Sequence, residues 1–98
     1  MNTLNLLTII AEESLANSIE MEIVNLGAKG YTSSPVSGKG LENVRDNQWE
    51  GENIKIETIV SDDTCKKILS LLQRKYFDRY AIIAFYHPVY VIRTNHFL

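Results

Sequence analysis

The stretch that decides the fold is Ile54-Lys55-Ile56-Glu57-Thr58-Ile59-Val60-Ser61-Asp62-Asp63. In residues 54–60 the side chains alternate between two faces, as they do in a strand, and one of these faces is almost wholly apolar. Ser61 then offers a hydroxyl as a helix N-cap, and the two aspartates place negative charge in the first helical turn. The stretch therefore predicts a strand that passes directly into a helix.

The segment downstream predicts that helix and two further strands. The apolar face of the helix is made of Cys65, Ile68, Leu69, Leu72 and Tyr76. On this face Cys65 is expected to be a buried, inert thiol. Residues Tyr80–His87 then predict a fourth strand, Pro88 is expected to end it, and Val89–Arg93 is expected to form a fifth, short strand.

The segment upstream predicts a strand, a helix and a second strand. Leu4–Ala11 is short and rich in Leu and Ile, which indicates a buried strand. The helix that follows has one apolar face, formed by Leu15, Ile19, Ile23 and Leu26. Gly27 is expected to be its left-handed C-cap, while Glu20 and Glu22 are expected on a solvated face. Tyr31–Val36 is the second strand, in which Pro35 is typical of a sheet edge.

This order of elements predicts a single α+β domain over residues 1–98, a ferredoxin-like βαββαβ sandwich with a short extra C-terminal strand. Two helices can cover only one face of a four-stranded sheet. The strands at Leu4–Ala11 and Ala81–Tyr86 nevertheless offer apolar residues to both faces. Because a second apolar face should not stay in contact with water, the sequence predicts self-association.

Composition and charge restrict the class of protein. The 98 residues are 45% hydrophobic and 22% charged, which is ordinary for a globular domain. The net charge of −2 argues against sequence-independent binding to nucleic acid. The longest apolar run, Ala81–Tyr86, is too short to span a membrane, and the first residues, Met1–Asn5, lack the basic run of a signal peptide. We therefore expect a soluble, cytoplasmic protein.

Four stretches resemble the P-II superfamily of signalling proteins. They are Gly27–Thr32, Ser37–Arg45, Ile54–Asp63 and Lys75–Ala81. The last is similar to the connection found in the SbtB-type branch, which is associated with bicarbonate transport. The resemblance implies a homotrimer with nucleotide sites in the clefts between subunits. It also implies a long T-loop at Ser37–Glu52, a segment that has no helical or strand period and is long enough to suggest a function.

The resemblance also carries over a set of nucleotide-binding positions. Those that match the adenosine part of the cleft are Thr32, Glu57 and Ile59. Those expected near the phosphates are Gly38, Lys39, Gly40, Arg45 and Arg93. Plainer interpretations stay open, because Gly-Lys-Gly can be simply a flexible loop, Arg45 can be a solvated arginine, and Glu57 and Arg93 can pair with neighbouring charges.

The same loop holds the residues that we expect to contact a partner. They are Glu42, Val44, Trp49 and Glu50, although Trp49 could instead pack the loop against its own trimer. Leu41 and Glu42 stand where the SbtB type usually has Ser-Arg. Because this loss of a cation should weaken triphosphate binding most, we expect AMP, ADP or cyclic AMP as the ligand, and no required cofactor.

These observations favour a nucleotide-sensing regulator of a membrane transporter, for bicarbonate or another anion, over an enzyme. No Ser-His-Asp, Cys-His or paired-carboxylate set can be placed, and His87 and His96 are weak evidence for a metal site. Two alternatives stay open. One is a slow nucleotide hydrolase that uses the same cleft, and the other is a CutA-like trimer without nucleotide binding.

Overall fold

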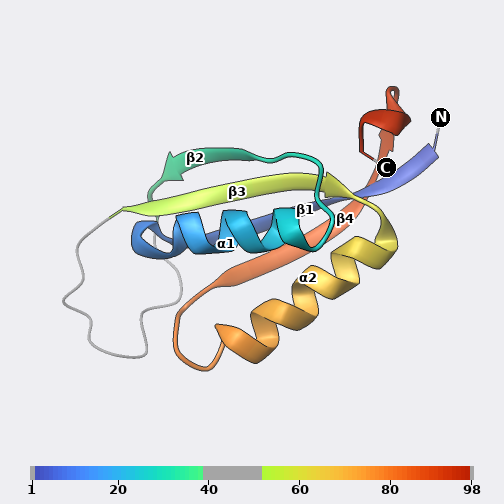
Figure 1. The fold of residues 1–98 in the computed structure, drawn as a ribbon. Helices are drawn as coiled ribbons and strands as arrows, with labels where there is room; N and C mark the ends of the chain where they lie inside the picture. The colour runs from blue at the N-terminus through green and yellow to red at the C-terminus, as the bar shows by residue number, and fades with distance from the viewer. Residues whose placement is uncertain (1, 39–51, 98) are drawn as a thin grey trace.

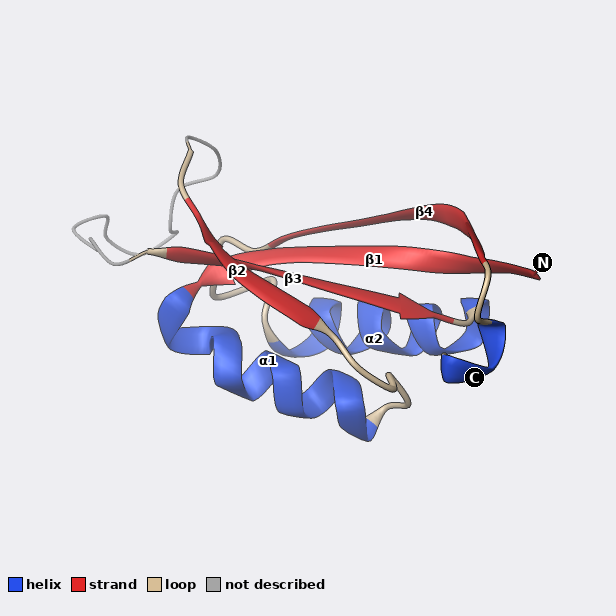
Figure 2. Ribbon diagram, turned by 90° about the horizontal axis from the view of Figure 1, so that it is seen from above, coloured by secondary structure: helices blue, strands red, loops and turns tan. Residues whose placement is uncertain are grey.

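A single antiparallel sheet carries two helices on one of its faces (Figures 1 and 2). The computed structural model describes residues 2–38 and 52–97. The elements in chain order are β1 (Asn2–Glu12), α1 (Glu13–Asn25), β2 (Thr32–Val36), β3 (Asn53–Val60), α2 (Asp62–Lys75), β4 (Ile83–Val91) and a short 3-10 helix (Thr94–His96). The order of the strands in the sheet is β2-β3-β1-β4, so the expected βαββαβ sandwich is confirmed.

The core lies between the sheet and the helices. Its fully buried side chains are Leu7, Ile9, Ile19, Ile23, Ile56, Val60, Cys65, Ile68 and Leu72. The even-numbered residues of β3 face the helices, as the alternation predicted, and the predicted apolar faces of both helices are confirmed. Burial raises the pKa of the Cys65 thiol, which keeps it protonated and unreactive at neutral pH.

The turn between α1 and β2 is fixed by two short-range features. Gly27 has φ of 125°, a conformation that side chains other than glycine rarely adopt, so the expected glycine C-cap is confirmed. The hydroxyl of buried Thr58 donates to the carbonyl oxygen of Gly30 at 2.6 Å. This bond ties the turn to β3 and positions the start of β2.

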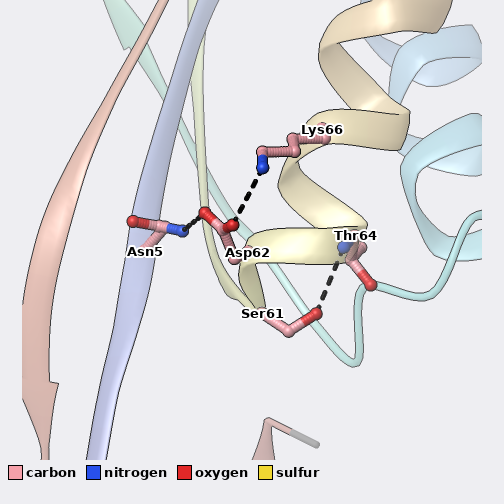
Figure 3. Close-up of polar contacts among 5 residues, drawn as sticks. All are labelled: Asn5, Ser61, Asp62, Thr64 and Lys66. Carbon is pink, nitrogen blue, oxygen red and sulfur yellow. Dashed lines mark hydrogen bonds and ion pairs between the residues drawn. The ribbon is translucent and has the colours of Figure 1, made fainter.

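The start of α2 is joined to β1 through polar contacts (Figure 3). The Ser61 hydroxyl accepts from the backbone N–H of Thr64 at 3.1 Å, as its predicted capping role requires. The side-chain amide of Asn5 donates to one oxygen of Asp62 at 3.1 Å, while Lys66 lies 3.2 Å from the other oxygen. Hydrogen bonds from Lys66 and then Asn5 hold the pKa of Asp62 below its usual value.

A second polar cluster joins the two helices to each other. The Tyr76 hydroxyl donates to Glu22 Oε1 at 2.6 Å, and the Lys75 ammonium pairs with Glu22 Oε2. The Glu22 side chain is only 21% exposed, so the expectation that it lies on a solvated face is wrong. Burial alone would raise the pKa of Glu22, but the bonds from Lys75 and Tyr76 outweigh burial and lower it.

The expected fifth strand is also wrong. β4 continues without a break to Val91, and Pro88 pairs in register with Asn5 of β1. Proline is tolerated here because β4 is an edge strand, where a residue without an N–H need not interrupt the ladder. After β4 the chain forms the 3-10 helix instead, and the Thr94 hydroxyl donates to the carbonyl oxygen of Val91 at 3.3 Å.

The two helices are 13 and 14 residues long, and within the described ranges no helix has the length and apolar character that a membrane span requires.

Candidate functional site

The face of the sheet opposite the helices has no element packed on it within the described ranges (Figure 2). Its β1 and β4 half is mainly apolar, with Leu6, Ile10, Ile83, Phe85 and Val89 around Thr8 and His87, while Leu4 and Val91 are already buried in the single chain. Phe85 is 50% exposed in the single chain. A largely apolar surface of this kind is typical of an interface, in agreement with the self-association that the sequence predicted.

The β2 and β3 half of this open face is polar. The register pairs Thr32 with Glu57 and Ser34 with Lys55, so four polar side chains stand together on it. Ile59 follows Glu57 on the same face and pairs with Leu6 at the border of the apolar half. The predicted adenosine-contacting residues are therefore neighbours in space.

Glu57 and Lys55 have their charges available for a ligand. Neither makes an ion pair with any residue in the described part of the chain. The plainer interpretation, in which Glu57 pairs with a neighbouring charge, is therefore not supported by the described residues. Lys55 is the one lysine or arginine on the open face among the residues described.

A groove of about 380 Å³ lies at the base of the loop between β2 and β3. It is lined by Pro35, Val36, Ser37, Gly38, Glu52 and Asn53. The backbone N–H of Glu13 donates to the carbonyl oxygen of Glu52 at 2.8 Å, which anchors this base to the start of α1. Gly38 therefore lies at an open groove, and its contact with a phosphate stays a prediction.

Arg93 lies away from all of these residues. It follows the end of β4, whose last residue pairs with Asn2, whereas β2 ends and β3 begins at the opposite end of the sheet (Figure 1). Glu57 lies between the two ends and pairs with Thr8. A single chain therefore cannot bring Arg93, Glu57 and Gly38 to one small ligand.

The other predicted site residues lie outside the described residues. They are the nucleotide-binding candidates Lys39, Gly40 and Arg45, and the partner-binding candidates Glu42, Val44, Trp49 and Glu50.

Three residues of this surface were not predicted as site residues from the sequence. Lys55 and Ser34 share the face of Glu57, and Glu52 lines the groove at the loop base. The alternation of residues 54–60 already placed Lys55 beside Glu57, so a sequence signal existed for it. No such signal existed for Ser34, because its position depends on the register between β2 and β3.

Comparison with known proteins identifies the family. The model of the nitrogen regulatory protein P-II family matches residues 4–96. The chain belongs to the P-II family. The expected resemblance to the P-II superfamily is thereby confirmed, placement in the SbtB-type branch stays a prediction, and the expected homotrimer is consistent with this family.

Solved structures of P-II-like proteins have the same fold. A PII-like signalling protein of Thermus thermophilus is 44% identical, with a TM-score of 0.85 over 98% of this chain and 96% of that chain. CPII of Thiomonas intermedia, bound to ADP, AMP and acetate, is 27% identical, with a TM-score of 0.83 over 97% of this chain and 94% of that chain. CPII bound to ADP and bicarbonate is 25% identical, with a TM-score of 0.85 over 99% and 96% of the respective chains.

Proposed function

We propose that this P-II family protein is a trimeric regulator that binds AMP, ADP or cyclic AMP in the clefts between its subunits. The observation that carries the proposal is the similarity over nearly the whole chain to CPII, whose structures hold ADP and AMP. In this proposal Thr32, Glu57 and Ile59 contact the adenosine. Gly38, Lys39, Gly40, Arg45 and Arg93 surround the phosphates.

The location between subunits is supported by the division of the open face. Its apolar half would be buried against neighbouring copies, because exposed patches of this kind are unfavourable in water. The polar half would then line the edge of that interface. A cleft between chains would also allow Arg93 and Gly38 to contact one ligand although they lie far apart in a single chain, since the two can come from different subunits.

The choice of a ligand with few phosphates rests on charge. Lys39, Arg45 and Arg93 are the cations that the proposal places at the phosphates, but Glu42 stands where the SbtB type usually has a further arginine, and Glu52 adds an acid at the loop base. Each further phosphate adds negative charge that only cations or backbone N–H groups can compensate. We therefore expect ATP to bind more weakly than ADP or AMP.

The output would be a signal to a partner and not a chemical reaction. In the proposal the ligand favours one arrangement of the Ser37–Glu52 loop, and Glu42, Val44, Trp49 and Glu50 contact a membrane transporter from the cytoplasmic side. Bicarbonate or another anion is the proposed transported ion, as in the SbtB-type branch. CPII bound to ADP and bicarbonate supports this choice.

Calorimetric titration of the purified protein with AMP, ADP, cyclic AMP and ATP tests the proposal. We expect saturable binding that Glu57→Gln weakens by about tenfold, since hydrogen bonds to a charged group are worth roughly 1.5–3 kcal/mol. Glu13→Gln is the matched control, because Glu13 is an exposed acid at the start of α1, outside the open face. Absence of binding by all four nucleotides at millimolar concentration would overturn the proposed function. Equal binding by Glu57→Gln and the wild type would overturn the assignment of Glu57.

A further inference from the structure

A groove of about 410 Å³ lies along α1, separate from the open face and the loop base. It is lined by Asn17, Glu20, Met21, Val24, Asn25 and Tyr31. Because α1 lies in the helix layer, this groove and the open face are on opposite sides of the sheet (Figure 2). The groove is therefore a surface separate from the proposed nucleotide site.

The walls of the groove are unusually apolar for the outer side of a helix. The inner side of α1 buries Ala16, Ile19 and Ile23, so the outer side should be polar. Met21 is instead 67% exposed and Val24, one turn further on, is 47% exposed. Single exposed apolar residues need no explanation, but here two on one helix face line the same groove as the half-exposed ring of Tyr31.

A fixed carboxylate stands beside these apolar walls. Glu20 Oε2 accepts from the Ser33 hydroxyl at 2.6 Å, and Glu20 Oε1 accepts weakly from the Tyr31 hydroxyl at 3.4 Å. Neutral hydroxyls orient the carboxylate but do not compensate its charge. Among the described residues Glu20 makes no ion pair, whereas Glu22 on the same helix is paired with Lys75.

The charge of the helix reinforces that of Glu20. α1 contains no lysine or arginine, so its last turn carries no basic residue. The C-terminal end of a helix is the negative end of its dipole, and the groove extends to Asn25 at that end. The groove therefore combines apolar walls with the carboxylate of Glu20, which makes no ion pair among the described residues.

We propose that this groove binds a partner protein segment in which an arginine stands one helical turn from a leucine or a similar aliphatic residue. The aliphatic side chain packs on Met21 and Val24. The guanidinium pairs with Glu20 and lies against the ring of Tyr31, a combination that suits the planar charge of arginine. The proposal is independent of the nucleotide site, so the protein could hold a nucleotide and this segment at the same time.

Titration of the full-length, ¹⁵N-labelled protein followed by NMR tests the proposal. The probe is a short alanine-based helical peptide with leucine and arginine one turn apart, and its control peptide has citrulline in place of the arginine. We expect saturable shifts confined to amides between Asn17 and Ser33. Glu20→Gln, which keeps an acceptor oxygen for Ser33, should weaken binding about fivefold, as should citrulline. Glu13→Gln should bind as the wild type does, and saturating ADP should leave the peptide affinity unchanged.

Several results would overturn the proposal. They are equal binding of the arginine and citrulline peptides, unchanged affinity in Glu20→Gln, and shifts confined to the open face or to residues 36–38 and 52–53. A fall in the solution mass of Met21→Glu relative to the wild type would also count against it, because it would show that a second copy of the chain occupies the groove. Loss of nucleotide binding with retained peptide binding would contradict only the proposed function.

Discussion

Removal of the Tyr76 hydroxyl should measurably loosen the contact between the two helices. Tyr76 is 5% exposed and donates at 2.6 Å to Glu22, whose side chain is 21% exposed, so Tyr76→Phe deletes a largely buried bond to a charged acceptor. Such bonds contribute roughly 1.5–3 kcal/mol. Lys75 still pairs with Glu22 in the variant, so we expect a loss of about 1.5 kcal/mol, at the lower end of that range.

The loss should depend on pH in a defined direction. The pKa of Glu22 is lower in the folded protein than its ordinary value of 4.5, so its charge stabilises the fold above that pH. This contribution decreases as the pH falls through the lowered pKa of the folded state. The difference in the free energy of unfolding between wild type and Tyr76→Phe should therefore be largest at pH 7 and clearly smaller once Glu22 is protonated.

Chemical denaturation at one fixed protein concentration is the assay, because subunit association contributes to apparent stability. Tyr80→Phe is the matched control. Its ring lies 6.1 Å from that of Tyr76, but its hydroxyl makes no hydrogen bond to any residue of the described ranges. Equal midpoints for Tyr76→Phe and Tyr80→Phe at pH 7 would refute the reasoning, as would a Tyr76→Phe deficit that does not shrink in acid. In a Glu22→Gln background the cost of Tyr76→Phe should fall by about half.

Three further substitutions test the local structure by the same denaturation assay. Gly27→Ala should destabilise the protein by roughly 1–3 kcal/mol, because φ is 125° there and the added Cβ would lie 3.1 Å from Thr64 Oγ1. Gly30→Ala is the control and should be close to neutral, because a Cβ added there meets no atom within 4 Å. Equal effects of the two substitutions would contradict this account. Ser61→Ala removes the cap of α2 and should cost about 1 kcal/mol, and an unchanged midpoint would show that the cap contributes nothing. Thr58→Val leaves the carbonyl of Gly30 without its donor and should cost about 1–3 kcal/mol, so a neutral result would argue against that anchor.

The fold could be predicted from the sequence wherever periodicity and capping agreed. Residues 54–63 gave the right strand, cap and helix because alternation and a serine N-cap are local signals. Pro88 was misinterpreted because its effect depends on whether the strand lies at an edge of the sheet. The position of β4 in the sheet is set by tertiary pairing, which no local pattern encodes.

The polar contacts were harder to predict for the same reason. Glu22 and Lys75 are far apart in the chain and meet only because the two helices lie side by side on the sheet. For the candidate site, the pairing of Thr32 with Glu57 confirms that these two positions are neighbours, although their contact with a nucleotide stays a prediction. The separation of Arg93 from Gly38 became visible only once the direction of β4 was known.

Native mass spectrometry of the purified protein with added ADP tests the central claim most directly. The account predicts an assembly of three 11.2 kDa chains that takes up ADP to a limit of three molecules, one for each cleft. It also predicts that Glu57→Gln keeps the three-chain mass but reaches this limit only at higher ADP concentration. A single-chain mass, or a trimer that remains free of ADP at millimolar concentration, would contradict the account.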